Sequence, residues 1–265
     1  MAAFSIHNPL VFTFGILGNL LTFLVFLAPG PTFYRIMKKK STEEFQSVPY
    51  VVTLLSNMLW LYYAIILSNE IPLITVNSVG GFIEAIYISI YIAYAPKKPR
   101  MLTLTLLLVS FVGLGFIIIF TNFIVKGAQR VEFLGWICAT LLATTYIAPL
   151  GITKKVIQTK SVEFMPISLS FAIVVSAAMW VCYGFLLKDL HIVVANTAGV
   201  IAGVVQIMLY MIYYKGKAHT ADKLSITHLN PNADPTSDLE IVSAKEDNAV
   251  SSIEHKEGLS MDPSN

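Results

Sequence analysis

Long apolar runs alternate with short polar segments over most of the chain. Seven of these runs reach the length of about 20 residues that a helix needs to cross a bilayer. They cover residues 10–30, 47–67, 72–94, 101–121, 132–153, 166–187 and 191–214. Helices satisfy their own backbone groups in lipid, and these runs are too long for barrel strands. The pattern therefore predicts an all-α integral membrane protein with seven transmembrane helices.

Lys and Arg residues are unevenly divided between the two sides of this helix set. Three lie in the even-numbered loops, whereas thirteen lie in the odd-numbered loops and at the start of the tail. The thirteen are Arg35, Lys38, Lys39, Lys40, Lys97, Lys98, Arg100, Lys154, Lys155, Lys160, Lys215, Lys217 and Lys223. Basic loops stay in the cytosol. We therefore expect the N-terminus outside and the C-terminus in the cytosol.

A set of residues occurs twice, mostly 120 positions apart, which is the mark of an internal repeat. The matched pairs include Pro29 and Pro149, Ser56 and Ser176, Trp60 and Trp180, Tyr63 and Tyr183, and Asn77 and Asn196. Helices 1–3 thus match helices 5–7, and helix 4 has no partner. The extra crossing gives both copies the same orientation, as in transporters with parallel repeats. We expect a 3+1+3 arrangement, with repeats at 10–94 and 132–214 joined by a linker helix at 101–121.

Composition supports a membrane protein with a polar tail. The chain is 55% hydrophobic and 13% charged, against about 25% charged in soluble domains. Nine of the sixteen acidic residues follow Ala218, so we expect residues 215–265 to form a disordered cytosolic tail. The two cysteines and five histidines show no disulfide or metal-ligand spacing, and the histidines are expected to be solvated or interfacial. The sequence contains no recognisable nucleophile–base pair or phosphate-binding loop, so we do not expect an enzyme. We also expect no cofactor or metal.

Four prolines are predicted to lie at one depth, near the cytosolic surface. They are Pro29, Pro49, Pro149 and Pro166, two in each repeat. A proline removes a backbone donor and weakens its helix, so these positions suggest hinges of a cytosolic gate. Prolines are also common in membrane helices without such a role. Their duplication at one depth favours hinges.

Two further layers are predicted above the prolines. The first contains Val25, Ser56, Thr145 and Ser176, and the second contains Trp60, Trp180, Asn77 and Asn196. Aromatic rings stack on the apolar faces of sugars, and an Asn side chain both donates to and accepts from hydroxyls. Trp also anchors helices at membrane surfaces, but midspan placement and duplication favour a site for a neutral solute.

Glu84 is the one acidic residue expected inside a span, seven residues after Asn77. An intramembrane carboxyl is a candidate for proton coupling. No buried basic partner is evident and the aligned position in the second repeat is Gly203, which favours a protonated or hydrogen-bonded structural role. Tyr63 and Tyr183, one turn outward from the tryptophans, suit an outer gate. Gly80 and Gly199 are expected to allow close helix packing.

These residues, with several short motifs, resemble the plant SWEET sugar transporters (the MtN3/saliva family) over about residues 10–215. The motifs are Lys40-Ser41-Thr42-Glu43, Val48-Pro49-Tyr50, Tyr94-Ala95-Pro96-Lys97-Lys98, Gly135-Trp136-Ile137-Cys138 and Lys160-Ser161-Val162-Glu163-Phe164-Met165-Pro166. The resemblance implies bidirectional facilitative sugar uniport by alternating access, with two bundles rocking about a central site. It also implies a proline gate, a Trp/Asn sugar pocket, and an outer gate of Tyr63, Tyr183 and Asp189.

The resemblance also suggests a substrate and a location. The layer Val25, Ser56, Thr145 and Ser176 is small, as in sucrose-preferring members, although Thr145 replaces their usual Val. We therefore expect sucrose, with hexoses as further substrates. Expected partners are the lipid bilayer and further copies of the chain, with no nucleic acid, in the plasma membrane. Two alternatives are a proton-coupled amino-acid transporter of the PQ-loop group and a seven-helix receptor.

Overall fold

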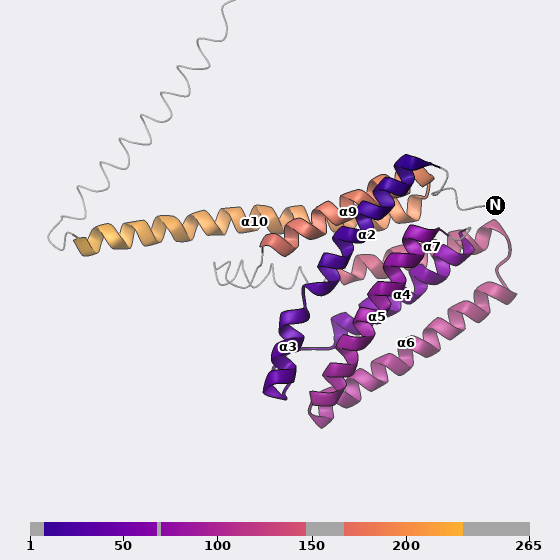
Figure 1. Cartoon of the computed structure of the whole chain (residues 1–265), viewed down its shortest axis with the longest axis horizontal. Coiled ribbons are helices and arrows are strands. Elements are labelled where there is room, and N and C mark those ends of the chain that lie inside the picture. The colour runs from indigo at the N-terminus through magenta and orange to yellow at the C-terminus, as the bar shows by residue number, and fades with distance from the viewer. Residues whose placement is uncertain (1–7, 68–69, 147–166, 230–265) are drawn as a thin grey trace, which may run out of the picture. The chain divides into compact units, whose positions relative to one another are not determined.

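The computed structural model describes residues 8–67, 70–146 and 167–229, and within these ranges all regular structure is helical (Figure 1). The helices are α2 (Pro9–Leu27), α3 (Gly30–Lys39), α4 (Val48–Ile66), α5 (Ile71–Tyr94), α6 (Lys97–Phe123), α7 (Ala128–Thr145), α9 (Ile167–Leu187) and α10 (Leu190–Leu229). The chain divides into a unit of residues Met1–Tyr213 and a second unit of residues Tyr214–Asn265.

Six segments of the described residues are long and apolar enough to cross a membrane. They correspond to the predicted helices 1–4, 6 and 7 and confirm an all-α membrane fold. Helix α7 has only 18 residues, including Arg130 and Glu132 in its first two turns. The predicted fifth span, 132–153, is described only as far as Tyr146.

Several helices begin where the sequence supplies a start signal. The side chain of Asn8 accepts from the backbone N–H groups of Leu10 and Val11, and Pro9 opens α2. Pro49 and Pro72 lie in the first turns of α4 and α5. A proline there removes no helix hydrogen bond, because the first N–H groups have no partner within the helix. These prolines fix where α4 and α5 begin.

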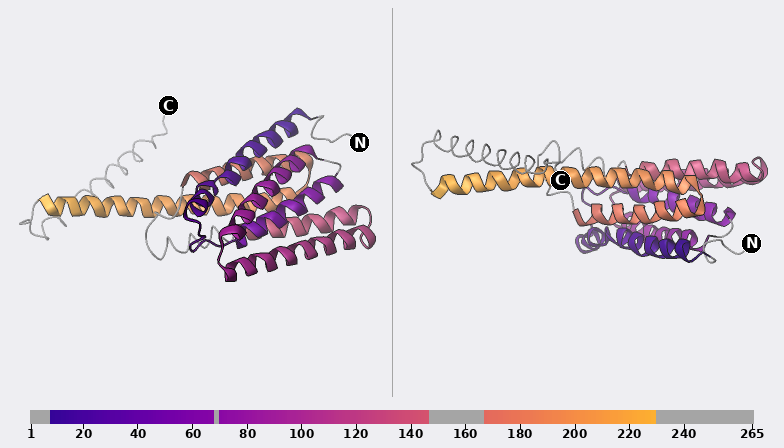
Figure 2. Two further views of the ribbon diagram at one scale, coloured as in Figure 1. Left: turned by 60° about the horizontal axis from the view of Figure 1, so that its bottom comes forward. Right: turned by 90° about the horizontal axis from the view of Figure 1, so that it is seen from above.

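Helix α5 packs against both α2 and α4, so it lies between them in the first three-helix bundle. Two further contacts join this bundle to the second repeat, because α2 packs on α9 and α4 packs on α7. In Figures 1 and 2, α6 runs along the margin of the bundle, where it contacts α4. The repeats therefore meet through equivalent helices, α2 and α4 on one side and α7 and α9 on the other.

Four glycines allow aromatic or cyclic side chains to approach a helix closely, and they occur as repeat-related pairs. A Cβ on Gly80 would lie 2.5 Å from the Phe26 ring, and one on Gly199 would lie 2.4 Å from the Tyr146 hydroxyl. A Cβ on Gly15 would similarly meet the Pro72 ring, and one on Gly135 the His191 ring. Gly80 and Gly199 thus do allow close packing, as predicted, with a ring as the immediate neighbour.

The segment after α2 differs from the prediction. A basic loop was expected, but the chain forms the helix α3 directly after Pro29. Phe33 and Ile36 are buried on one face of α3, whereas Lys38 and Lys39 are exposed. Residues three apart share a helix face, so this short stretch is amphipathic. Arg35 and Lys39 form ion pairs with Glu43, whose pKa is lowered chiefly by the hydrogen bond from Lys39.

Disorder was predicted from residue 215 onward, whereas helix α10 continues to Leu229 in the described residues. The stretch from Lys215 to Leu229 contains no proline, and Ala, Lys and Leu residues favour helix. Pro231 is the first proline after the helix. Residues 230–265 lie outside the described residues.

Candidate functional site

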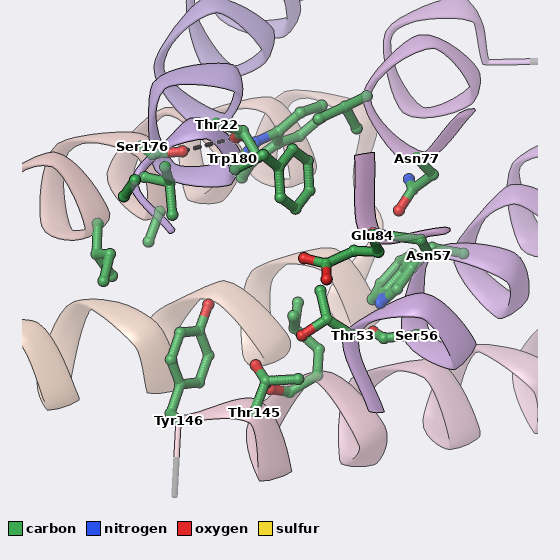
Figure 3. A pocket seen from close by; sticks show the side chains of 18 of the residues that line it. Thr22, Thr53, Ser56, Asn57, Asn77, Glu84, Thr145, Tyr146, Ser176 and Trp180 are labelled. Carbon is green, nitrogen blue, oxygen red and sulfur yellow. Dashed lines mark hydrogen bonds between the residues drawn. The ribbon is translucent and has the colours of Figure 1, made fainter. Parts of the chain in front are cut away.

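A cavity of about 620 Å³ lies between the two repeats. It is lined by residues from α2, α4 and α5 on one side and from α7, α9 and α10 on the other (Figure 3). Its lining includes all four members of the predicted Trp/Asn layer and all four of the predicted small layer. Pro29 and Pro49 also line it, whereas Pro149 and Pro166 lie outside the described residues. Residues predicted from the duplication are therefore brought together in space.

Asn77 and Asn196 are held in equivalent conformations. Each side-chain Nδ2 donates to the carbonyl four residues earlier, that of Leu73 or Ile192, at 2.8 Å. An Asn amide has two N–H donors and one acceptor oxygen. This bond uses a single N–H, so each residue keeps a donor and an acceptor for a bound molecule. Their burial, at 8% exposure each, gives these groups a low-dielectric setting.

Trp60 and Trp180 are both buried, and each packs edge-on against a tyrosine one turn away, Tyr63 or Tyr183. A Cβ on Gly18 would lie 2.9 Å from the Trp180 ring, so α2 approaches this ring closely. The indole Nε1 of Trp180 donates to Thr22 Oγ1 at 2.9 Å. Both rings are thus fixed by packing before any ligand is bound.

Three of the four residues of the small layer, Ser56, Thr145 and Ser176, carry a hydroxyl group. Ser176 shares a hydrogen bond of 2.7 Å with Thr22 across the two repeats. The Thr145 hydroxyl donates to the Leu142 carbonyl of its own helix at 2.6 Å. Because its hydrogen is used within α7, Thr145 presents no free donor in this arrangement. It therefore differs from Val mainly by its exposed lone pairs.

The two described prolines occupy different helix positions, which corrects part of the hinge argument. Pro29 lies at the junction between α2 and α3, where the chain leaves one helix and starts the next. Pro49 lies in the first turn of α4 and so interrupts no helix. Pro29 thus lies at a break between two helices and Pro49 does not, and a hinge at Pro29 stays a prediction.

Two tyrosine–carboxylate hydrogen bonds are among the contacts that connect the repeats beyond the Trp layer. Tyr63 Oη donates to Asp189 Oδ2 at 2.6 Å, and Tyr183 Oη donates to Glu70 Oε2 at 3.1 Å. Each tyrosine thus binds the acidic residue that precedes the third helix of the other repeat. All four side chains are buried, and none lines the described part of the cavity. The sequence analysis missed Glu70, although it stands 119 positions before Asp189.

His191 is buried beside this pair, whereas the sequence analysis expected a solvated or interfacial histidine. Its Nδ1 lies 3.2 Å from Tyr63 Oη and 3.3 Å from Asp189 Oδ1. Its Nε2 lies 3.5 Å from Glu132 Oε2. Gly135 has no side chain, which leaves room for the imidazole. The imidazole ring therefore contacts both Tyr63 and Asp189 and stabilises the hydrogen bond between them.

Glu84 lines the cavity and has a carboxyl directed into it (Figure 3). Within the described residues its Oε2 has no hydrogen-bond partner. The sequence predicted a protonated or hydrogen-bonded carboxyl at this position, and the structural role of Glu84 stays a prediction. No Lys, Arg or His lies among the described lining residues. The cavity thus offers hydroxyl, amide and aromatic groups with one acidic side chain.

Comparison with known proteins identifies the family. A family of sugar efflux transporters for intercellular exchange, MtN3/saliva, matches residues 12–99 and 132–218. This chain belongs to the SWEET family. The two matched segments coincide with the helices that carry the duplicated residues, and the unmatched stretch between them contains most of α6.

Individual relatives agree with this assignment. The bidirectional sugar transporter N3 of Medicago truncatula is 54% identical over 211 residues, covering 79% of each chain. SWEET13 of Oryza sativa subsp. japonica is 48% identical and covers 85% of this chain and 81% of its own. A solved structure of a eukaryotic SWEET transporter superposes with a TM-score of 0.75 at 33% identity. It covers 80% of this chain and 100% of that one. The SWEET fold thus extends over most of the protein.

Proposed function

We propose that this protein is a bidirectional facilitative sugar uniporter that works by alternating access and prefers sucrose. The observation that carries the proposal is the cavity between the repeats, where paired Trp and Asn residues meet. Rings present faces for the C–H surfaces of a sugar, and the amides supply donors and acceptors for its hydroxyls. Its volume of about 620 Å³ lies within the usual range for small-molecule sites, about 300–1,000 Å³.

The lining argues for a neutral substrate. An amino acid would bring an ammonium and a carboxylate into the membrane, where unpaired charges are costly. The described lining offers Glu84 as a partner for the first and no cationic side chain for the second. This composition favours a sugar over the substrate of a PQ-loop amino-acid transporter. The small residues Val25, Ser56, Thr145 and Ser176 leave space for two sugar rings.

The gates support alternating access. Two tyrosine–carboxylate hydrogen bonds join the repeats on one side of the Trp layer, and the cavity extends on the other side to Pro29 and Pro49. With the orientation predicted from the basic loops, the closed side faces outward. Rocking of the bundles about the cavity breaks these bonds while the Pro29 side narrows. Further elements of the proposal are self-association and residence in the plasma membrane.

Flux of labelled sucrose and glucose in both directions, in oocytes or liposomes, tests the function. We expect the protein to dissipate a sugar gradient in either direction without any effect of a protonophore. Asn77→Ala and Asn196→Ala should each abolish flux and leave surface expression intact. Accumulation of sugar driven by a pH gradient would overturn the uniport mechanism, and absence of sugar flux would overturn the function.

A further inference from the structure

Three residues that line the cavity each have a buried side-chain polar atom without a hydrogen-bond partner within the described residues. These atoms are Glu84 Oε2, Asn57 Nδ2 and Trp60 Nε1. All three residues line the cavity, and each is at most 6% exposed. Buried polar groups in folded proteins nearly always have a partner, so three such atoms around one cavity require an explanation.

The three groups come from two adjacent helices of the first repeat. Asn57 and Trp60 are three residues apart on α4 and therefore share a helix face. Glu84 lies on α5, seven residues after Asn77, and therefore shares a face with that cavity residue. A Cβ on Gly80 would lie 2.9 Å from Asn57 Nδ2, which shows how closely α5 approaches this amide. In Figure 3, the side chains of Glu84 and Asn57 lie on the same side of the cavity.

The second repeat has no equivalent of this set. The positions that correspond to Asn57 and Glu84 are Ala177 and Gly203. Trp180 does correspond to Trp60, but its Nε1 donates to Thr22 Oγ1. The position of Thr22 is occupied by Leu142 in the second repeat, so Trp60 has no such acceptor. The unpaired groups are therefore confined to one half of a cavity whose Trp and Asn residues are duplicated.

We propose that Asn57, Trp60 and Glu84 form a one-sided sugar subsite, which binds the hydroxyls of one ring and fixes the orientation of a two-ring sugar. The amide and the indole N–H donate to sugar oxygens, and the Glu84 carboxyl accepts from a sugar hydroxyl. The duplicated Asn residues and Trp rings cannot distinguish the two ends of a substrate, whereas the Asn57 amide, the Trp60 N–H and the Glu84 carboxyl occur in one repeat without such a counterpart. The inference rests on the proposed function and adds specificity determinants to it.

Thermal stability distinguishes this role from a structural one. If Glu84 stabilises the fold, its replacement by an apolar residue of similar size lowers the melting temperature. If it serves a ligand, the same replacement removes an unpaired buried carboxyl and leaves the melting temperature equal or higher, because such a group is unfavourable without a partner. Glu84→Leu is therefore the informative variant, with the exposed Glu44→Leu as the matched control.

The test is binding of sucrose and its monodeoxy derivatives to the purified full-length chain in detergent, followed by calorimetry. We expect Glu84→Leu to weaken sucrose binding by up to about tenfold, as for loss of one hydrogen bond. One monodeoxy derivative should bind wild-type protein up to about tenfold more weakly than sucrose does. Glu84→Leu should bind that derivative and sucrose equally, because removing the sugar hydroxyl and removing the carboxyl abolish the same hydrogen bond. The sugar hydroxyl whose removal couples to Glu84→Leu and the one that couples to Asn57→Ala should belong to the same ring of sucrose.

The tryptophans supply a second comparison that does not depend on Glu84. Trp60→Phe removes an N–H that has no partner among the described residues, whereas Trp180→Phe removes one that is bonded to Thr22. Only Trp60→Phe should show coupling to a sugar oxygen. The inference is wrong if wild-type protein binds sucrose and no deoxy position couples to any of the three residues, or if the couplings divide between both rings. Failure of the wild type to bind or transport any sugar instead overturns the proposed function.

Discussion

Replacement of Tyr63 by Phe tests whether the tyrosine–carboxylate bonds close the outer side. The Tyr63 hydroxyl is buried and donates to Asp189 Oδ2 at 2.6 Å. A hydrogen bond to a charged group contributes about 1.5–3 kcal/mol. If the bond exists only in the closed state, its loss shifts the balance toward the open state by about 10- to 150-fold, since 1.4 kcal/mol corresponds to a factor of ten.

Thiol labelling from outside measures this shift. Val76 lines the cavity and packs in the core cluster that contains Tyr63 and Trp60, so Val76→Cys reports access to the cavity. Cys138 and Cys182 are the two native cysteines and are first replaced by Ala. We expect a membrane-impermeant thiol reagent to modify the reporter at least tenfold faster when Tyr63 is Phe. The longer bond of Tyr183 to Glu70, at 3.1 Å, predicts a smaller increase for Tyr183→Phe.

A third tyrosine supplies the control. Tyr91 Oη donates to the Phe45 carbonyl at 2.9 Å, within the first repeat. Tyr91→Phe therefore removes a hydrogen bond without releasing any contact between the repeats, and the labelling rate should stay at the wild-type value. An unchanged or slower rate in Tyr63→Phe would refute the role of this bond in closure. An equal increase in Tyr91→Phe would attribute the effect to general loosening.

Three further changes test other parts of the structure. Thr145→Met fills part of the cavity and should lower sucrose flux relative to glucose flux, and unchanged relative fluxes in paired uptake would contradict this account of selectivity. Gly135→Ala places a Cβ 2.5 Å from the His191 ring and should lower the melting temperature, whereas Gly113→Ala, with nothing within 4 Å, should not. Pro29→Ala should join α2 to α3 in one helix and slow transport at normal surface expression, and wild-type flux would exclude a hinge there.

The sequence predicted the membrane helices well because hydrophobic length is a direct requirement of the bilayer. Helices α4 and α5 begin and end within one residue of the predicted runs, and α9 ends where its predicted run ends, at Leu187. The 120-residue repeat also predicted which distant residues meet, since Trp60, Trp180, Asn77 and Asn196 line one cavity. Residues of this set that belong to different repeats are more than 100 positions apart in the sequence. Duplication was therefore the informative signal for the site.

Other features escaped prediction because they depend on packing between elements. The repeat shows that tyrosines and acidic residues are duplicated, but not that Tyr63 contacts the acid of the other copy. Glu70 was further hidden because its counterpart, Asp189, is a different residue type. Helix α3 was taken for a basic loop because its apolar side consists of only Phe33 and Ile36. A search for helical spacing in short basic segments would have found it.

Symmetry and asymmetry have separate causes in this structure. In the proposed mechanism, two similar bundles rock against each other and separate equally on both sides of the outer gate. Equivalent hydrogen bonds on the two sides, Tyr63 to Asp189 and Tyr183 to Glu70, are therefore appropriate for such a gate. A disaccharide of unlike rings has no twofold axis, so a fully symmetric pocket would bind it equally well in two orientations. In the proposed subsite, the polar groups of Asn57, Trp60 and Glu84 break this equivalence, although the Trp60 ring also packs on Tyr63. We therefore expect changes at Asn57 and Glu84 to alter which sugar is bound without altering how the bundles close.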